Sequence, residues 1–230
     1  MSAILEGKRV LITHVSGFMG PTLVDVFNQH QARVYESDHA FATYEETQAV
    51  VDAAIEDLGA IDVLVANLSV PAPSTMANRV SEEEWREMFA AIMDPLPRLA
   101  KAILPHMIRN KKGKILVMGS AAALRGINRT TTYSAARGAQ LAYVQSLGIE
   151  VARHNIQVNA IAQNFVDNPT YFPEEVKANP QFQERLKREV PLGRLVKAEE
   201  DAELAAYLCS DNADCFVGQV FPLSGGWAIR

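Results

Sequence analysis

Cysteine is scarce in this sequence, since only Cys209 and Cys215 occur in 230 residues. Two thiols cannot form the set of several disulfides that stabilises small secreted domains. We interpret both as small residues that are buried or half-buried in a reducing compartment. A cytoplasmic location is therefore expected.

Long hydrophobic runs and an excess of basic residues are also absent. No apolar run approaches the roughly 20 residues of a membrane span. The N-terminal stretch MSAILEGKRV lacks the basic segment and long apolar run of a signal peptide. Acidic residues (27) outnumber lysines and arginines (22), which gives a net charge of −5. We therefore expect neither nucleic acid nor an anionic membrane surface as a partner.

What the sequence does contain is a regular alternation of short apolar strands with helical patterns. This alternation implies crossover connections and a parallel sheet, so we expect one doubly wound, Rossmann-like α/β domain of three layers over residues 1–230. The predicted strands are 9–13, 32–37, 61–67, 113–120, 156–162 and 217–226. The predicted helices are 19–30, 43–59, 81–110 with a break near Pro95 and Pro97, 131–154 and 199–210, and charged helical segments follow a loop over 163–173.

A doubly wound sheet binds its ligands at the carboxyl ends of its strands. Four segments of this sequence follow strands and should therefore surround one crevice. They are residues 13–20, 66–70, 119–122 and 163–171.

Three residues near this crevice suggest acid–base chemistry. Ser120 ends a strand, and Tyr133 and Arg137 lie four residues apart in the stretch YSAAR, on one face of a helix. A nearby positive charge favours phenolate and lowers the pKa of a tyrosine from about 10. We interpret Tyr133 as a general base and Ser120 as a hydroxyl that anchors the substrate.

The stretches THVSGFMG, IDVLVANLS, GKILVMGSAAA, YSAAR, IQVNAIAQN and FVGQVFPLSGG follow one another in the order of a known family pattern. Together they resemble the short-chain dehydrogenases/reductases over nearly the whole chain. Family members carry a cofactor turn of the form T-G-x-x-x-G-x-G. In this sequence Thr13 and Gly20 match that turn, whereas His14 and Phe18 replace its first two glycines.

Three further departures concern the active site of that family. Arg137 stands where the family has a catalytic lysine, Ile92 where it has an asparagine, and Gln163-Asn164 where it has Pro-Gly. Between Asp38 and Ile61 the chain is also too short for the extra helix and strand that the family has on the adenosine side. A side chain at His14 and a ring at Phe18 would fill the space that glycines leave for a pyrophosphate.

A serine, Tyr-x-x-x-Arg and an aromatic residue in the glycine turn resemble the halohydrin dehalogenases, a branch of the same fold family that uses no cofactor. The resemblance implies a lyase that needs no metal. Ser120 would bind the hydroxyl of a vicinal haloalcohol, Tyr133 would take its proton, and Arg137 would keep Tyr133 ionisable. The oxygen would then displace halide to give an epoxide, and small anions such as azide, cyanide or halide would open epoxides in reverse.

The resemblance also assigns the rest of the pocket and the assembly. The leaving halide would bind at a turn that offers backbone N–H groups, walled by an aromatic ring. The halide-binding residues would be Phe18, Gln163, Asn164, Phe165 and Val166, and the substrate pocket would be lined by Tyr171, Phe172 and Trp227. The chain would assemble as a homotetramer.

Two other hypotheses remain open. The chain could be an NAD(P)-dependent reductase with a degenerate motif, which Asp38 favours because dehydrogenases bind the adenosine ribose at that position. It could also be a non-catalytic sensor, although such a protein has no need to retain Ser120 and Tyr133. His14 is an alternative base, but no serine or cysteine partner for it is evident in the sequence.

Overall fold

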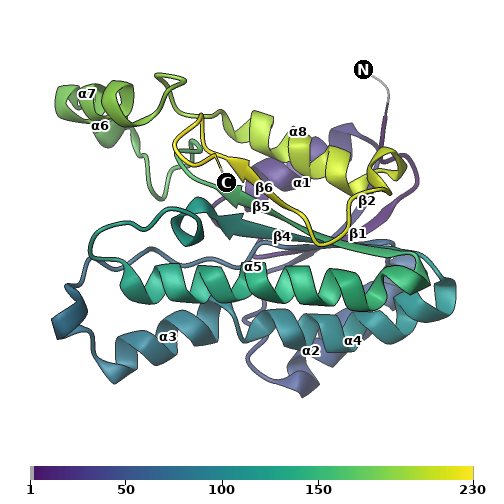
Figure 1. Cartoon of the computed structure of the whole chain (residues 1–230). Helices are drawn as coiled ribbons and strands as arrows, with labels where there is room; N and C mark the ends of the chain where they lie inside the picture. Colours follow the sequence, from purple (N-terminus) through teal and green to yellow (C-terminus); the bar gives the residue numbers. More distant parts are fainter. Residues whose placement is uncertain (1–2, 230) are drawn as a thin grey trace.

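The computed structural model describes residues 3–229 and contains a six-stranded sheet in which every neighbouring pair of strands is parallel. The strand order is β2-β1-β3-β4-β5-β6, so the direction of winding reverses between β1 and β3 (Figure 1). The strands are β1 (Arg9–Thr13), β2 (Arg33–Ser37), β3 (Val63–Ala66), β4 (Gly113–Ser120), β5 (Ile156–Gln163) and β6 (Val220–Leu223). The predicted doubly wound fold is confirmed.

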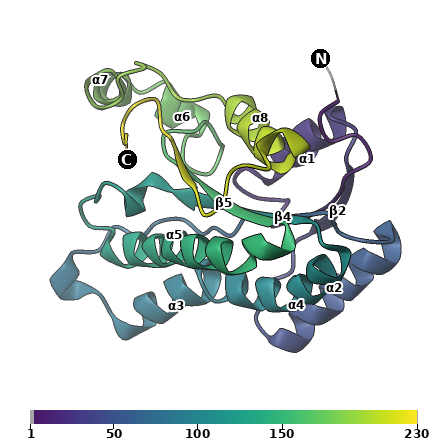
Figure 2. The same ribbon diagram turned by 45° about the vertical axis from the view of Figure 1, so that its right-hand side comes forward.

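Helices cover both faces of the sheet, as Figure 2 shows. The helices α1 and α8 pack on one face, and α2, α4 and α5 pack on the other, with α3 beside α5. The helices are α1 (Gly20–Gln29), α2 (Tyr44–Leu58), α3 (Glu82–Ile92), α4 (Pro95–Asn110), α5 (Thr131–Val151), α6 (Glu174–Lys177), α7 (Pro180–Glu189) and α8 (Ala198–Cys209). No helix within residues 3–229 is both long and apolar enough to span a bilayer.

Local sequence signals set the ends of these helices. The hydroxyl of Thr43 accepts the N–H of Glu46 at the start of α2 (3.1 Å), and Gly59 ends that helix with a left-handed φ of 82°. Ser81 caps α3 in the same way. The predicted break in the long helical stretch separates α3 from α4, because Pro95 has no N–H with which to continue α3 and opens α4 instead.

The core lies on both sides of the central strands. Every residue of β3 and β4 is buried, which is the burial expected of a parallel sheet that helices cover on both faces. One prediction about packing was wrong in part. Cys209 is buried in α8, but Cys215 is exposed, because it follows the surface turn of Asp211–Ala213 instead of lying in an element.

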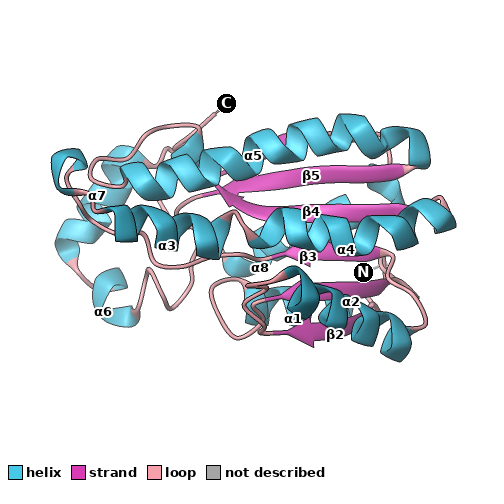
Figure 3. Ribbon diagram, turned by 90° about the horizontal axis from the view of Figure 1, so that it is seen from below, coloured by secondary structure: helices cyan, strands magenta, loops and turns pink. Residues whose placement is uncertain are grey.

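The carboxyl ends of the strands meet at one edge of the sheet, where α3, α6 and α7 also lie (Figure 3). Ser120 at the end of β4 lies opposite Gln163 at the end of β5. The side-chain amide of Asn67, just after β3, donates to the backbone of the turn after β1. The predicted crevice segments therefore surround one site.

Candidate functional site

Tyr133 and Arg137 form a stacked pair in the first two turns of α5. The guanidinium carbon of Arg137 lies 5.2 Å from the centroid of the Tyr133 ring. Both side chains are buried, with relative exposures of 6% and 2%. The four-residue spacing of a helix thus brings a phenol and a cation together away from solvent.

Arg137 is held mainly by neutral acceptors. One terminal nitrogen donates to the carbonyls of Leu68 (2.9 Å) and Met118 (3.0 Å) and to the side chain of Gln140 (2.9 Å), and the other donates to the hydroxyl of Ser69 (2.6 Å). Among residues 3–229, no carboxylate pairs with this guanidinium, and its Nε has no partner. Its positive charge is therefore free to act on Tyr133 in a region of low dielectric.

Burial and the charge of Arg137 act in opposite directions on the pKa of Tyr133. Burial by itself would raise the pKa of Tyr133. The charge of Arg137, together with hydrogen bonding from Ser120, Arg137 and Tyr171, outweighs burial and lowers the pKa below the usual value for a phenol. The phenolate of Tyr133 therefore forms at lower pH than that of an ordinary tyrosine, and a phenolate can accept a proton.

Ser120 presents its hydroxyl beside this phenol. The extended backbone at the end of β4 leads into a short turn, where the Ser120 hydroxyl accepts the N–H of Ala122 (3.2 Å). The side chain is buried, and because its oxygen accepts from Ala122, its O–H is left to donate toward Tyr133. Ser120 therefore lies beside the pair of Tyr133 and Arg137; that these three residues are catalytic stays a prediction.

The turn after β1 has an unusual backbone that neighbouring residues hold in place. His14 and Phe18 have left-handed φ values of 48° and 52°, a conformation that glycine adopts at least cost. The amide of Asn67 donates to the carbonyls of His14 (2.9 Å) and Gly17 (3.3 Å). Gly20 is required, because a Cβ there would lie 2.4 Å from the carbonyl oxygens of His14 and Val15. The backbone of this turn is thus fixed by contacts within the protein.

Asp38 is engaged by the same turn. One oxygen of its carboxylate accepts both the N–H of Ser16 (3.0 Å) and the hydroxyl of Ser16 (2.9 Å). A ribose at this position would have to displace Ser16. Burial is the largest influence on the nearby His14 and lowers its pKa, which favours the neutral imidazole. The residues on this side of the site do not fit a dinucleotide.

The turn after β5 has a backbone suited to an anion, but two of its N–H donors, those of Asn164 and Phe165, are already used. Phe165 has a φ of 52°, and a left-handed residue within a turn makes successive N–H groups converge. The N–H of Phe165 donates to the side-chain oxygen of Asn164 (2.9 Å), and the N–H of Asn164 donates to Leu223. An anion in this turn would have to replace the Asn164 oxygen as the acceptor of the Phe165 N–H.

Tyr171 connects three parts of the site. Its ring lies 5.6 Å from the ring of Phe18. Its hydroxyl accepts the N–H of Ala72 (3.0 Å) and donates to the carbonyl of Val70 (3.2 Å), both in the segment after β3. Burial and the neighbouring Tyr133 raise the pKa of Tyr171, so it is the phenol of the pair that keeps its proton.

The remaining predicted pocket residues form an aromatic cluster. The ring of Phe165 lies 6.2 Å from Phe172 and 6.0 Å from Trp227, and Trp227 also packs against the guanidinium of Arg125. The ring of Phe172 also packs against the ring of Phe182, with centroids 5.4 Å apart. Trp227 thus packs against Phe165 in the turn after β5.

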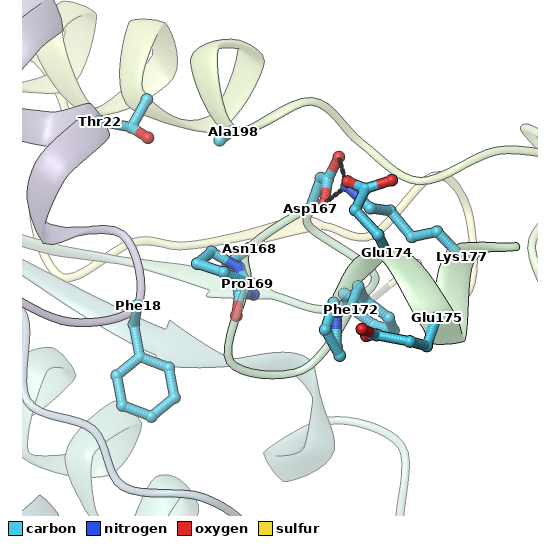
Figure 4. A pocket seen from close by; sticks show the side chains of 11 residues that line it. Phe18, Thr22, Asp167, Asn168, Pro169, Phe172, Glu174, Glu175, Lys177 and Ala198 are labelled. Atoms are coloured by element: carbon cyan, nitrogen blue, oxygen red, sulfur yellow. Dashed lines mark hydrogen bonds and ion pairs between the residues drawn. The ribbon is translucent and has the colours of Figure 1, made fainter.

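A cavity of about 400 Å³ lies between the turn after β1 and the segment after β5 (Figure 4). Phe18 forms one wall, and the opposite wall carries Asp167, Glu174, Glu175 and Lys177. Lys177 pairs with both Asp167 and Glu174. Ser120, Tyr133 and Arg137 do not line this cavity, whereas Phe18, which forms one of its walls, packs against Tyr171.

Sequence reasoning missed Gln140 and Asn67. Gln140 accepts from Arg137 and donates to the carbonyl of Ile92 (2.6 Å), where the family pattern has its asparagine. Its position three residues after Arg137, on the same helix face, was the available signal. Asn67 follows the third strand directly, but nothing in its neighbours indicates that it holds the turn after β1.

The sequence of this chain is similar to known proteins over nearly its whole length. The family model described as Enoyl-(Acyl carrier protein) reductase matches residues 2–228. A 3-oxoacyl-[acyl-carrier-protein] reductase of Thermotoga maritima is 26% identical over 98% of this chain and 99% of its own.

Two solved structures combine higher sequence identity with close similarity of fold. A protein described as a dehalogenation enzyme is 34% identical, with a TM-score of 0.92 over 98% of this chain and all of its own. A halohydrin dehalogenase bound to ethyl (2S)-oxiran-2-ylacetate is 29% identical, with a TM-score of 0.87 over 96% of this chain and 97% of its own. The predicted resemblance to halohydrin dehalogenases is thereby confirmed.

Proposed function

The chain belongs to the short-chain dehydrogenase/reductase family, and within it we propose that this protein is a halohydrin dehalogenase that acts without a cofactor. The observation that carries the proposal is the buried pair of Tyr133 and Arg137. A guanidinium with no carboxylate partner among the described residues lowers the pKa of the phenol next to it. Such a phenol ionises at lower pH than a free tyrosine, and its phenolate can act as a general base toward an alcohol.

The reaction follows from this arrangement. The Ser120 hydroxyl donates to the oxygen of a vicinal haloalcohol and holds it beside Tyr133. The phenolate of Tyr133 removes the hydroxyl proton as that oxygen attacks the neighbouring carbon. The new C–O bond closes the epoxide, the C–halogen bond breaks, and halide leaves with the bonding electron pair. Tyr133 then returns the proton to solvent, and ring opening by an anion runs through the same steps in reverse.

The halide would bind at the turn of Gln163–Val166. The left-handed Phe165 supports this assignment, because it directs backbone N–H groups toward one point. Phe18 and the aromatic cluster of Phe165, Phe172 and Trp227 would exclude water from the leaving anion. The substrates on this proposal are haloalcohols, epoxides, halides and pseudohalides.

The turn after β1 argues against a nicotinamide cofactor. Side chains occupy two of its family glycine positions, and Ser16 already binds Asp38. Three carboxylates against one lysine also make the wall of the adjacent cavity unfavourable for a pyrophosphate.

The test is release of halide from a vicinal chloro- or bromoalcohol in buffer without cofactor. We expect release that is lost in Tyr133→Phe and retained in Tyr207→Phe, which removes an exposed phenol on α8. The proposal fails if the wild-type protein releases no halide from either class of substrate.

A reductase is the second candidate, because the curated relative from Thermotoga maritima carries that name. Titration calorimetry with NADH and NADPH separates the two candidates. No specific binding at millimolar cofactor is expected for the dehalogenase, and micromolar affinity would favour the reductase.

The resemblance also supports a homotetramer. The exposed Ile149 on α5, with a relative exposure of 77%, is consistent with helices that pair between subunits. Light scattering in solution would measure the mass of the assembly, and a monomer would contradict this assignment.

A further inference from the structure

Gln140 is fully buried, and its side-chain amide joins two parts of the site. Its Oε1 accepts from Nη1 of Arg137 over 2.9 Å, and its Nε2 donates to the carbonyl of Ile92 over 2.6 Å. A guanidinium can only donate and a carbonyl can only accept, so these two partners fix which way the amide points. Position 140 therefore needs a side chain that accepts at one atom and donates at the next.

The carbonyl of Ile92 lies where a helix leaves its acceptors free. Ile92 is the last residue of α3, and the last carbonyls of a helix have no N–H partner within that helix. The side chain of Ile92 belongs to the same apolar cluster as Tyr133. The amide of Gln140 thus fixes the end of α3 and the guanidinium of Arg137 relative to each other.

The acceptors that hold Arg137 are uncharged. They are the carbonyls of Leu68 and Met118, the hydroxyl of Ser69 and the amide of Gln140. Glutamate has nearly the same shape as glutamine, but it would place a negative charge at the position of this amide. A carboxylate 2.9 Å from the guanidinium would oppose the effect of the cation on a neighbouring phenol. Glutamine satisfies the guanidinium without this opposing charge.

We propose that Gln140 is a positioning residue of this site, whose neutral amide holds Arg137 beside the ring of Tyr133 and leaves the charge of the guanidinium uncompensated. The guanidinium carbon lies 5.2 Å from the centroid of that ring, and both side chains are buried. A cation in such a place stabilises a phenolate, which agrees with the lowered pKa of Tyr133. The consequence for catalysis rests on the proposed dehalogenase function, whereas the effect on Tyr133 does not.

The ionisable groups on the neighbouring elements have partners of their own. Glu84 of α3 accepts a hydrogen bond from a threonine at the start of α5 (2.7 Å). Asp94, just beyond α3, pairs with the arginine four residues further along the chain (3.7 Å). The hydroxyl of Tyr171 is bonded to the segment after β3, and β4 contributes the neutral hydroxyl of Ser120. A change at position 140 leaves these groups in place and acts on Arg137.

Gln140→Glu is the direct test, with Gln145→Glu as the matched control, because Gln145 is exposed on the same helix. Tyrosinate absorbance is followed as pH is raised, and Tyr133→Phe identifies the contribution of Tyr133. We expect the midpoint of Tyr133 to move up by about one pH unit in Gln140→Glu, because the new carboxylate opposes the cation. The midpoint should stay in place in Gln145→Glu. A midpoint that does not move in Gln140→Glu would overturn the proposal.

Gln140→Met separates the effect of charge from the loss of the two hydrogen bonds. Methionine is unbranched and uncharged and has no amide. We expect a lower melting temperature but a smaller shift of the Tyr133 midpoint than in Gln140→Glu. Equal shifts in the two variants would reject the electrostatic role. If Gln140→Glu does not fold, Ser69→Asp places a carboxylate at the other nitrogen of the guanidinium, at a partly exposed position. It should raise the midpoint in the same way, and an unchanged midpoint there would overturn the proposal.

The kinetic counterpart is the rising limb of halide release against pH. In Gln140→Glu this limb should move upward with the absorbance midpoint, so that the rate below the limb falls roughly tenfold and recovers at high pH. A rate that falls equally at every pH would show that Gln140 only maintains the fold and would overturn the proposal. A shifted absorbance midpoint in a protein that releases no halide would support the inference and reject the proposed function.

Discussion

Polar groups are used differently on the two sides of the edge where the strands end, the β1–β2 side and the β4–β5 side. On the β1–β2 side, the carboxylate of Asp38 and the amide of Asn67 are used to hold the turn that contains Ser16 and Gly17. On the β4–β5 side, the charge of Arg137 is buried without a carboxylate partner among the described residues.

This difference separates the two sides by what their polar groups can still offer to a ligand. A polar group that is satisfied within the fold has little left to offer a ligand, whereas a buried cation without a counter-ion acts on whatever lies beside it. On the β1–β2 side, the polar side chains are engaged by the turn after β1. On the side that carries Tyr133, the positive charge of Arg137 has no counter-ion among the described residues and lowers the pKa of the phenol.

The largest expected effect comes from removing the base on the β4–β5 side. Tyr133→Phe should lower halide release by about 10²–10⁴-fold, because no phenolate remains to take the proton. Initial rates of halide release measure this effect, and circular dichroism checks that the fold is kept. Near-normal turnover would move the role of base to another group, with His14 the first to examine.

Asp201 offers a contrast to Arg137, because this buried carboxylate on α8 has no hydrogen-bond partner among the described residues. Burial raises its pKa to about 7. Since the folded pKa lies above the unfolded value, the folded state binds the extra proton, and stability should fall as pH rises from about 4 to 7.

Asp201→Asn should remove that fall and stabilise the protein at pH 8 by as much as about 4 kcal/mol. Denaturant unfolding at pH 5 and pH 8 gives the comparison. Equal unfolding free energies for the wild type at the two pH values would show that Asp201 finds a partner when it ionises.

Two substitutions at Arg137 distinguish the effect of its positive charge on Tyr133 from the effect of its guanidinium shape. In Arg137→Met the pKa of Tyr133 should rise, because burial is then no longer opposed by the cation, and the rising limb of ring closure should move to higher pH. Arg137→Lys keeps a charge and should move the limb less or not at all. The measurement is halide release against pH for both variants.

Epoxide opening needs Tyr133 in its protonated form, so its pH optimum should lie below that of ring closure. A rising limb that stays in place in Arg137→Met would show that Arg137 has a structural role. Thermal unfolding of both variants controls for the loss of its buried hydrogen bonds.

Phe18→Ala tests whether the two halves share the halide site. Loss of the ring should weaken product inhibition by bromide, because the anion would be less well shielded from water. Inhibition constants for the wild type and the variant give the answer. Unchanged inhibition would place the halide away from Phe18.

The smallest effect is expected on the closed side. Asp38→Ala removes the acceptor of two exposed hydrogen bonds and should cost at most about 1 kcal/mol of stability. Halide release should remain at the wild-type rate. A large loss of activity would show that the closed side takes part in catalysis.

The sequence was sufficient for most of the fold, because buried parallel strands are continuous apolar runs and helix ends carry caps such as Thr43 and Gly59. The sequence also predicted that Ser120, Tyr133 and Arg137 are neighbours. Strand ends share one edge of the sheet, and residues i and i+4 share one face of a helix.

Long-range side-chain contacts could not be predicted in this way. The bonds from Asn67 to the turn after β1 and from Gln140 to Ile92 cross between elements whose relative placement no local pattern specifies. The left-handed φ of Phe165 was equally hidden, because it is unusual for a residue with a large side chain.

The turn after β1 has one more consequence. His14 and Phe18 follow a backbone path natural to glycine, and each pays about 1–2 kcal/mol for doing so. Contacts with Asn67 and the close approach of Gly20 preserve that path. The main chain of this turn thus keeps a shape that glycine adopts most readily, although His14 and Phe18 carry side chains. A classification by backbone shape alone would group this protein with the reductases it resembles and would overlook the side chains in which this turn departs from the family pattern.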